Sequence, residues 1–504
     1  MKRMIVRPSF LTTKSCLSIM LLCNIFLCLS CSKEEEPIDN PLGLEVHDIV
    51  IVGGGIAGLT CGYYLENKDF VILEKSSRVG GRALSGTYNN VTYSKGAEYL
   101  GTPEGHLAQM IKGLALSLKE IPEPMDGYFD GSKFYYGSDA INGYLINNSS
   151  VNTFNRFVNL LLNNYVQYDD IPDLEYNGWA SGLDHISARQ WLLNNNIPQV
   201  YSDKYNVASR GLFGASLNEI SALSFIPEAA FDYDETDIAY APIVENRAVY
   251  DVSASQDEHS ESFTFLKGLT ELTDKLGERM KAKIKLNQEV VKIYFEGGAY
   301  HVDYKNSDGS THTMLARKIV LAVPAPIALN IATDVISADK QAIMKEVEYS
   351  SYATAVLFSN VPIFNKAFDL AVPDGYFFTD LYDATWVQRY YDKSITPNTY
   401  IASVYIAPFT YTDHSLDGMT DAELLKKVYA DLDKIFPGAS SKVTGHDITH
   451  FPYAYPVMTP GAYERLVRLN DLNKGSLVLA GDYLIYPTFE SAVESGYQAA
   501  RRVK

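Results

Sequence analysis

The feature that most constrains the fold is a glycine-rich turn between an apolar run and a helix-like segment near the start of the chain. Residues 47–52 are apolar enough for a buried parallel strand, and residues 56–66 follow with the pattern of a helix. Residues 70–74 then form a second apolar run. Strand, glycine-rich turn, helix and strand predict a βαβ unit of a parallel sheet.

The turn itself reads Gly-x-Gly-x-x-Gly. The first glycine permits a tight turn, the second lets the backbone approach a pyrophosphate, and the third lets the helix pack closely on the strand. The helix N-terminus offers free N–H groups to phosphates. Glu74 lies 21 residues after Gly53, where a carboxylate accepts hydrogen bonds from ribose hydroxyls and disfavours a 2′-phosphate. Together these features predict a dinucleotide site, whereas the glycines alone would also suit a turn without a ligand. The predicted contacts are Gly53, Gly55, Ile56, Ala57, Gly58 and Glu74.

The next residues carry a more specific resemblance. Residues 74–82 read Glu-Lys-Ser-Ser-Arg-Val-Gly-Gly-Arg, which is similar to the stretch after the ribose acid in the flavin-containing amine oxidase superfamily. That superfamily includes monoamine oxidases, protoporphyrinogen oxidases and phytoene desaturases. Residues 95–101, 286–293, 479–482 and 490–496 resemble further segments of the same family in the same order.

The resemblance implies that the cofactor is FAD. It implies a guanidinium on the pyrophosphate, a Gly-Ala segment near the isoalloxazine ring, and a backbone contact to adenine from the 286–293 strand. An acid near the ribityl chain and a last helix that faces the pyrimidine edge complete the site. No cysteine follows Cys61, so we expect non-covalent FAD. The residues implied are Arg78, Gly81, Arg82, Gly96, Ala97, Glu98, Val290, Gly481, Asp482, Ser491, Ala492 and Val493.

No catalytic side chain is predicted. Members of the family usually carry a lysine that holds a water at flavin N5, on a strand ahead of an apolar turn. Here that turn resembles residues 362–364, and Thr354 stands in the lysine's place. Tyr455 and Tyr486 are candidates for the family's aromatic pair, although a packing role is the better expectation for any one tyrosine of 36.

The order of these segments predicts an α/β fold. We expect a three-layer Rossmann-type FAD-binding domain built from residues 47–100, 258–345 and 446–504, with an inserted α+β substrate domain of residues 101–257 and 346–445. Expected helices are 151–165, 187–194, 203–212, 266–281 and 489–503. Expected strands in the later segments are 290–295, 299–304, 311–315, 318–324 and 476–480.

Residues 1–31 resemble a bacterial lipoprotein signal peptide. Four basic residues precede an apolar run of residues 16–30, which ends at Ser30-Cys31 as in a lipobox and is followed by an acidic run. Cys31 is therefore the predicted lipidation site, and residues 32–46 the flexible tether of an extracytoplasmic, membrane-anchored protein. An ordinary cleaved signal peptide or a short anchor helix is the alternative.

The composition argues against two classes of function, nucleic-acid binding and metal binding. The net charge of −18 argues against nucleic acid as a partner, and no Cys and His set has metal-ligand spacing. The oligomeric state is not predicted. The expected function is an FAD-dependent oxidoreductase that oxidises an amine or another activated C–H substrate and passes electrons to O₂ or a carrier. The alternative is a non-catalytic surface lipoprotein that binds a flavin or a porphyrin-like ligand.

Overall fold

A computed structural model of the chain describes residues 38–168, 176–233, 260–392, 394–395 and 397–504. The predicted signal peptide, with Cys31, and residues 32–37 of the predicted tether lie outside these ranges. Residues 39–504 form one compact unit. Among the residues described, none of the helices combines the length and the apolar character that a bilayer crossing requires.

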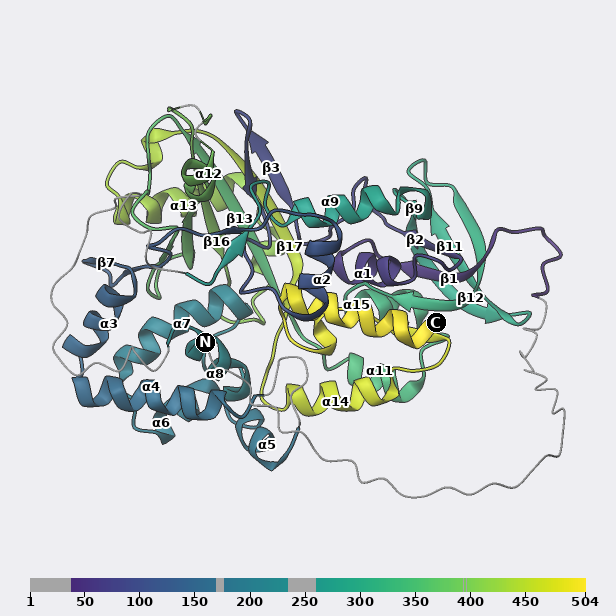
Figure 1. The fold of residues 1–504 in the computed structure, drawn as a ribbon, viewed down its shortest axis with the longest axis horizontal. Helices are drawn as coiled ribbons and strands as arrows, with labels where there is room; N and C mark the ends of the chain where they lie inside the picture. The colour runs from purple at the N-terminus through teal and green to yellow at the C-terminus, as the bar shows by residue number, and fades with distance from the viewer. Residues whose placement is uncertain (1–37, 169–175, 234–259, 393, 396) are drawn as a thin grey trace, which may run out of the picture. The chain divides into compact units, whose positions relative to one another are not determined.

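The first sheet has a parallel core extended by an antiparallel meander (Figure 1). Its strands run in the order β10-β11-β12-β1-β2-β9, and β18 pairs with the end of β12. The predicted βαβ unit is confirmed, because β1 and β2 pair in parallel across the turn to α1. The strands are β1 (Val46–Val52), β2 (Phe70–Leu73), β9 (Ile284–Lys285), β10 (Glu289–Glu296), β11 (Ala299–Lys305), β12 (Thr311–Leu321) and β18 (Leu477–Leu479).

One expectation about this sheet was wrong. Residues 311–315 and 318–324 were expected as two strands, but residues 311–321 form the single strand β12. Its first half pairs in antiparallel fashion with β11, and its second half pairs in parallel with β18. The polar pair Arg317-Lys318 does not break the strand, because the edge of β12 simply changes partner there while β1 pairs along the other edge.

Helices cover both faces of the first sheet, which gives the three layers that we predicted. Alternate residues of β1 point to opposite faces: Ile49 and Ile51 pack under one helical layer, and Val50 and Val52 under the other. The first layer contains α1 (Ile56–Tyr64), α2 (Gly105–Gly113), α9 (Thr270–Arg279) and α15 (Phe489–Val503). The second contains α10 (Ala325–Ala332), α11 (Ala338–Met344) and α14 (Ala462–Leu472).

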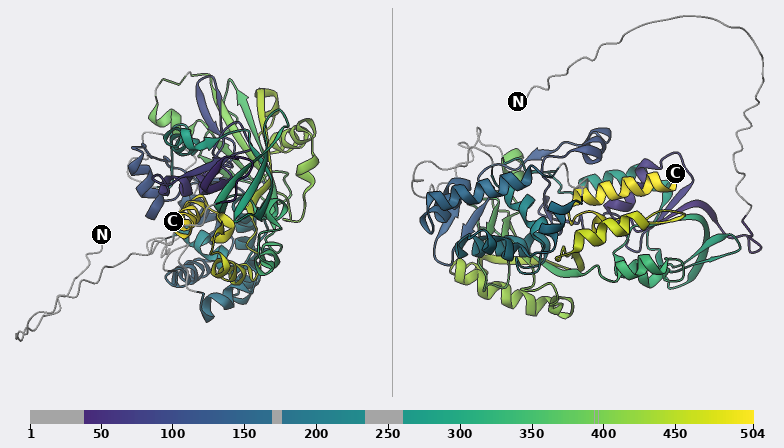
Figure 2. Two further views of the ribbon diagram at one scale, coloured as in Figure 1. Left: turned by 90° about the vertical axis from the view of Figure 1, so that its right-hand side faces the viewer. Right: turned by 90° about the horizontal axis from the view of Figure 1, so that it is seen from below.

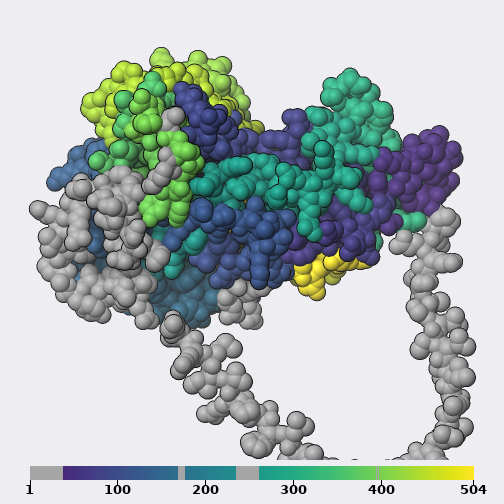
Figure 3. All heavy atoms as spheres, turned by 45° about the horizontal axis from the view of Figure 1, so that its top comes forward, coloured from purple at the N-terminus to yellow at the C-terminus, as the bar shows by residue number. Residues whose placement is uncertain are grey.

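The second sheet has seven strands in the order β17-β13-β16-β15-β14-β6-β7. They are β6 (Gly127–Phe129), β7 (Phe134–Tyr136), β13 (Tyr349–Ser359), β14 (Asp369–Ala371), β15 (Asp380–Asp383), β16 (Tyr400–Ile406) and β17 (Val443–Pro456). Helix α13 (Asp421–Ile435) packs on one face, and it lies at the opposite end of the molecule from the β10–β12 meander in Figure 3. The domain boundary that we expected at residue 446 falls inside β17, since that whole strand pairs with β13.

The remaining helices gather on the side of the second sheet away from α13 (Figures 1 and 2). They share one hydrophobic core with the second layer of the first sheet. These helices are α3 (Ser138–Asn147), α4 (Val151–Tyr165), α5 (Gly178–Asp184), α6 (Ala188–Asn194), α7 (Gln199–Phe213) and α8 (Ala222–Phe231). The smaller elements are β3 (Ser85–Tyr88) with β4 (Val91–Ser94), β5 (Lys119–Glu120) with β8 (Phe263–Thr264), and α12 (Trp386–Tyr391).

Candidate functional site

The glycine-rich turn leaves the N-terminus of α1 open. A Cβ atom at Gly53, where φ is +103°, would lie 2.4 Å from the Ala322 carbonyl oxygen, and one at Gly58 would lie 2.0 Å from the Gly53 oxygen. Both positions therefore require glycine for packing. A Cβ at Gly55 would meet nothing within 4 Å. The middle glycine thus faces free space where the helix presents its N–H groups, as a phosphate ligand needs.

Glu74 is held at the end of β2, beside this turn. Its side-chain oxygens accept hydrogen bonds from the backbone N–H groups of Gly54 (2.7 Å) and Ser76 (2.8 Å). Each oxygen keeps a lone pair for a further donor such as a ribose hydroxyl. The Gln288 N–H donates to the Glu74 carbonyl at 2.9 Å, which brings the start of β10, with Val290, to the same segment. The predicted ribose acid and adenine contact are therefore neighbours.

Arg82 joins the first and last cofactor motifs. Its guanidinium forms an ion pair with Asp482 at 2.8 Å and donates to the Ala454 carbonyl. Burial alone would lower the pKa of the Arg82 guanidinium, but the Asp482 carboxylate more than offsets this, so the pKa is raised. A Cβ at Gly96 would lie 2.0 Å from the Arg82 oxygen, so the predicted isoalloxazine segment also packs here. A permanently charged guanidinium beside the predicted cofactor motifs suits a contact with a pyrophosphate.

Arg78 has a different environment from Arg82. Its terminal nitrogens donate to the carbonyl oxygens of Val79 and Gly81, each at 2.8 Å. The neighbouring Gly80 N–H donates to the Gly54 oxygen at 2.8 Å, which ties this loop to the glycine-rich turn. The predicted contact at Arg78 thus has backbone partners of its own, and its visible role is to hold the loop that carries Gly81 and Arg82.

The last helix, α15, begins shortly after β18, near the predicted cofactor motifs of the first sheet. Residues 491–493, in the first turn of α15, are buried. The Gly481 N–H donates to the Ser495 hydroxyl at 2.9 Å, which fixes the end of β18 against the helix. A Cβ at Gly496 would lie 2.2 Å from the Ala57 oxygen, so α15 and α1 are in close contact. The start of α1 thus packs against the middle of α15, and the N-terminus of α15 lies about 10 Å farther along that helix.

The face of the second sheet opposite α13 is polar and aromatic. Leucine, alanine and valine side chains of alternate positions pack on α13, so their neighbours must point the other way. The strand register sets these neighbours in two adjacent rows, Thr354–Tyr405–Asp380 and Ser403–Tyr382–Asp369. We call these six residues the carboxylate face.

The carboxylate face touches the predicted isoalloxazine segment. The Thr354 hydroxyl donates to the Lys95 carbonyl at 2.9 Å. The Tyr405 hydroxyl lies 2.8 Å from the Gly96 oxygen and 2.6 Å from a carboxyl oxygen of Glu98. Burial raises the pKa of Glu98 to about 7, although hydrogen bonds from hydroxyl groups oppose this. The structure thus connects the first sheet's cofactor motifs to the second sheet through residues 95–98.

Three residues singled out in the sequence can now be placed. Thr354, which stands where the family has lysine, lies on the carboxylate face, and the nearby Lys95 amine instead pairs with Asp447 at 2.8 Å. The Tyr486 ring is enclosed in the core and its hydroxyl donates to the Ser224 oxygen, so it has a packing role. Tyr455 packs edge-on against Tyr352, with ring centroids 5.7 Å apart.

Sequence reasoning missed three carboxylates. Asp369 and Asp380 belong to the carboxylate face, and Asp126 lies beside Asp369, because β6 and β14 run in parallel and the Asp369 N–H donates to the Met125 oxygen. We call Asp126, Asp369 and Asp380 the acid trio. The available signal was a short strand with an acid at each end, as in residues 380–383. Within the described ranges, no three His, Cys, Asp or Glu side chains converge to hold a metal ion.

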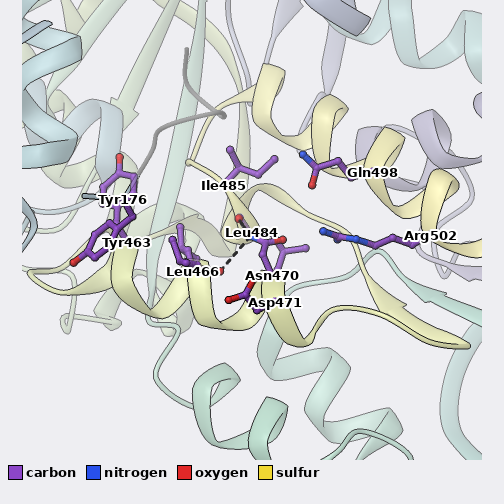
Figure 4. Close-up of a pocket in the computed structure, with 10 residues that line it drawn as sticks. Tyr176, Tyr463, Leu466, Asn470, Asp471, Leu484, Ile485, Gln498 and Arg502 are labelled. Atoms are coloured by element: carbon purple, nitrogen blue, oxygen red, sulfur yellow. Dashed lines mark hydrogen bonds between the residues drawn. The ribbon is translucent and has the colours of Figure 1, made fainter. Parts of the chain in front are cut away.

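A separate groove of about 260 Å³ lies between α14 and the C-terminal half of α15 (Figure 4). Asn470, on its wall, donates to the Leu484 oxygen at 2.5 Å. Arg502 at the other wall is eleven residues beyond Ser491, which is about 16 Å along the helix. Leu484 and Ile485, which also line the groove, directly follow the closing motif at Asp482, so the groove extends from that segment toward the C-terminal end of α15.

Comparisons with known proteins agree with this geometry. The family model for flavin containing amine oxidoreductase matches residues 56–504. An L-amino-acid oxidase of Siganus canaliculatus is 25% identical over 492 residues, which cover 90% of this chain and 85% of the relative. A probable flavin-containing monoamine oxidase A of Dictyostelium discoideum is 22% identical over 56% of this chain and 58% of its own length.

Solved structures share the fold. Putrescine oxidase bound to putrescine has a TM-score of 0.67 with 14% identity, over 90% of this chain and 98% of that one. Cyclohexylamine oxidase from Brevibacterium oxydans has a TM-score of 0.65 with 15% identity, over 91% and 98%. The chain therefore has the same overall fold as these oxidases. The chain belongs to the flavin containing amine oxidoreductase family and is a flavin-dependent oxidoreductase whose cofactor is FAD.

Proposed function

We propose that this protein oxidises a cationic amine at the carbon next to nitrogen, and that the electrons pass from reduced FAD to O₂ or a carrier. FAD supplies the chemistry, because it accepts the hydride equivalent from that carbon. The observation that carries the proposal is the carboxylate face, which meets the cofactor motifs at residues 95–98. Carboxylates attract an ammonium group and repel the carboxylates of a porphyrin-like substrate.

Glu98 is the proton acceptor in this proposal. An ammonium substrate must lose a proton before its nitrogen lone pair can support removal of hydride. Glu98 has a pKa of about 7 through burial, and a group with a pKa near the working pH can both accept and release a proton. Its 2.6 Å contact with Tyr405 fixes the position of the carboxyl group.

The test is reduction of the bound flavin under anaerobic conditions. The purified holoenzyme is mixed with primary amines of different length, with an L-amino acid and with a porphyrinogen, and loss of the absorption bands of oxidised flavin is followed. We expect amines to reduce the flavin and the porphyrinogen not to do so. Reduction by the porphyrinogen alone would contradict the proposal.

The alternative is a protein that binds a flavin or porphyrin-like ligand without turnover. Its support is the absence of an Arg-Arg pair in the basic leader segment, which favours export of an unfolded chain that acquires FAD afterwards. If the flavin stays oxidised with every donor while FAD remains bound, this alternative replaces the enzymatic proposal.

We also propose that FAD is held without a covalent bond and that the protein is a lipoprotein outside the cytoplasmic membrane. The support for the first point is the sequence, which has no cysteine after Cys61, together with the complete burial of Cys61 in α1. The support for the second is the basic leader, the apolar run and Cys31, followed by acidic residues.

A further inference from the structure

Basic side chains gather at the edge of the first sheet where its parallel strands begin. The Lys318 amine donates to the Val503 carbonyl at 2.7 Å, and the N–H of the next residue, Ile319, donates to the Ser476 carbonyl at 2.7 Å. These contacts bring together β12, the C-terminal end of α15 and the segment before β18. We call the following six residues the basic end: Lys318, Lys340, Lys474, Arg501, Arg502 and Lys504.

The cations of the basic end have no acidic partner. Among the residues that the structure describes, the ion pairs involve other lysines and arginines. The Lys340 amine donates to the Leu477 carbonyl, and the Arg501 guanidinium lies over the Tyr497 ring. Burial, with repulsion from Arg502, lowers the pKa of Lys340 to about 8, and burial lowers the pKa of Arg502 as well. An anion from outside the chain would therefore be stabilised here.

This surplus of positive charge is local, since the net charge of the chain is −18. Lys474, Arg501 and Lys504 are exposed, and Arg502 is half-buried on the wall of the groove between α14 and α15, which also carries the acid Asp471 (Figure 4). Salt screens exposed charges beyond about 8 Å, so the acidic remainder of the surface has little effect on an anion that touches this edge.

The tether joins the fold beside the basic end. The Asp39 N–H donates to the Gly297 carbonyl at 3.4 Å, and three residues later the Tyr300 hydroxyl lies 2.8 Å from the Ser476 hydroxyl. About 10 Å of strand therefore separates the tether from the segment before β18. Asp39 is the eighth residue after Cys31, so a lipid on Cys31 would keep this edge within about 28 Å of a bilayer.

The basic end lies opposite the cofactor motifs on the first sheet. The glycine-rich turn follows the carboxyl end of β1, whereas the tether joins ahead of its amino end at Val46. Helix α15 runs back along the sheet, because its C-terminal end contacts Lys318. In Figures 1 and 2, residues 39–45 and the C-terminal end of α15 both lie at the end of the compact unit away from the second sheet.

We propose that the basic end binds the anionic headgroups of phospholipids in the membrane to which Cys31 anchors the chain. This inference rests on the proposed lipid anchor and adds a second, electrostatic contact to it. Ammonium and guanidinium groups pair with phosphate oxygens, and the planar guanidinium of Arg502 suits a bidentate contact. Docking on this edge turns the cofactor edge away from the bilayer, so that the proposed substrate reaches it from the aqueous side.

The test uses the unlipidated chain of residues 32–504, which contains the whole compact unit of residues 39–504. Its FAD-bound form is sedimented with vesicles of phosphatidylcholine alone and with vesicles that contain equal amounts of phosphatidylcholine and phosphatidylglycerol, at low and at high NaCl. We expect binding to the phosphatidylglycerol vesicles only, and weaker binding at high salt. Binding to neither kind of vesicle at low salt, or equal binding to both, would overturn the inference.

A triple variant removes three exposed cations of the basic end, Lys474→Gln, Arg501→Gln and Lys504→Gln. A lysine or arginine near an anionic surface contributes about fivefold to the affinity, so the partition coefficient on phosphatidylglycerol vesicles should fall by about 100-fold. The absorption spectrum of bound FAD checks that the variant is folded. Wild-type partitioning of a folded variant would refute the assignment of the surface.

The matched control removes the same charge from the other half of the molecule. It replaces three exposed lysines in or between elements of the second sheet and α13, Lys133→Gln, Lys366→Gln and Lys426→Gln. Its partition coefficient should stay close to that of the wild type. An equal loss in both triple variants would show an effect of net charge alone and would overturn the inference.

Two further measurements separate the basic end from a free-phosphate site and from the anchor. A rise in the thermal unfolding midpoint with inorganic phosphate, without vesicle binding, would assign the basic end to free phosphate and overturn the membrane contact. High salt releases an electrostatic contact but not a lipid anchor, so cell fractions prepared in high salt test the anchor by itself. Release of the wild-type protein by high salt would count against the proposed anchor and not against the basic end.

Discussion

Gly55 and Gly58 lie three residues apart in one motif, yet the structure assigns them different tasks. At Gly58 a methyl group would lie 2.0 Å from the Gly53 oxygen and 3.2 Å from the Ala322 side chain. At Gly55 the same methyl group would meet nothing within 4 Å, and its φ of −71° suits any residue. We therefore predict that Gly58→Ala damages the protein without FAD, whereas substitution of Gly55 damages only FAD binding.

The magnitudes follow from these contacts. Backbone atoms around Gly58 must move by roughly 1 Å to admit a methyl group, and overpacking of this kind lowers the free energy of unfolding by about 3 kcal/mol. Gly55→Ala leaves that free energy unchanged or raises it by about 0.5 kcal/mol, because it restricts the unfolded chain. Gly55→Val blocks the helix N–H groups from the pyrophosphate, and the loss of two charge-assisted hydrogen bonds weakens FAD binding by about 100-fold or more.

The assay has two parts. Urea unfolding of the FAD-free protein gives the free energy of unfolding of each variant, and the slopes are compared to check that the denatured states match. Titration of FAD, followed by its fluorescence, gives the dissociation constant. Wild-type FAD affinity in Gly55→Val would refute the assignment of the pyrophosphate to α1. Wild-type stability in Gly58→Ala would refute the packing argument.

Three further predictions test other parts of the reasoning. The pKa of Glu98 is about 7 in the folded chain and near 4.5 when unfolded, so its burial lowers stability as the pH rises from 4.5 to 7. Urea unfolding at pH 5 and pH 7.5 should therefore show that Glu98→Gln removes about 2 kcal/mol of that decline, and an unchanged pH dependence would contradict it. Arg82 contacts Asp482 and the Ala454 carbonyl through Nη1, and Arg82→Lys removes the second terminal nitrogen that a bidentate contact with the pyrophosphate needs; FAD affinity should therefore fall by about tenfold while the FAD-free protein remains folded by circular dichroism, and full affinity would rule out a pyrophosphate contact. Cys31→Ser should move the protein from the membrane to the soluble fraction of the producing cell, and retention on the membrane would exclude the lipid anchor.

The sequence predicts the βαβ unit and the geometry of its glycine-rich turn well, because their requirements are local. A tight turn, a helix N-terminus and an acid at a strand end all fall within residues 47–82, so the pattern of Gly53, Gly55, Gly58 and Glu74 is sufficient. Family resemblance predicted only that Asp482 lies near the cofactor, and the contact between Asp482 and Arg82 of this unit comes from the structure. The structure adds the reason, which is the pairing of β18 with β12 beside β1.

The carboxylate face could not be predicted, because it depends on register between strands distant in the chain. Asp369, Asp380 and Tyr405 become neighbours only when β14, β15 and β16 pair, and Asp126 joins them through a parallel contact with a strand some 240 residues later. No periodicity in a single segment contains that information. The same limitation explains why β12 was predicted as two strands. Its change of partner at Arg317 depends on other strands and leaves no pattern in the sequence of β12 itself.

The pairing of β18 with β12 also sets the order in which the protein can mature during synthesis. The phosphate-binding turn appears within the first 60 residues, but the strand and helix that complete its surroundings are among the last 30. Until those residues emerge, residues 319–321 of β12 lack their partner on this edge, and the apolar side of α1 lacks the covering helix α15. A nascent chain therefore exposes this unpaired strand edge while residues 322–476 are synthesised, and chaperone protection during that interval should favour correct folding. Loss of even the final 30 residues should leave a chain that aggregates instead of a smaller flavoprotein.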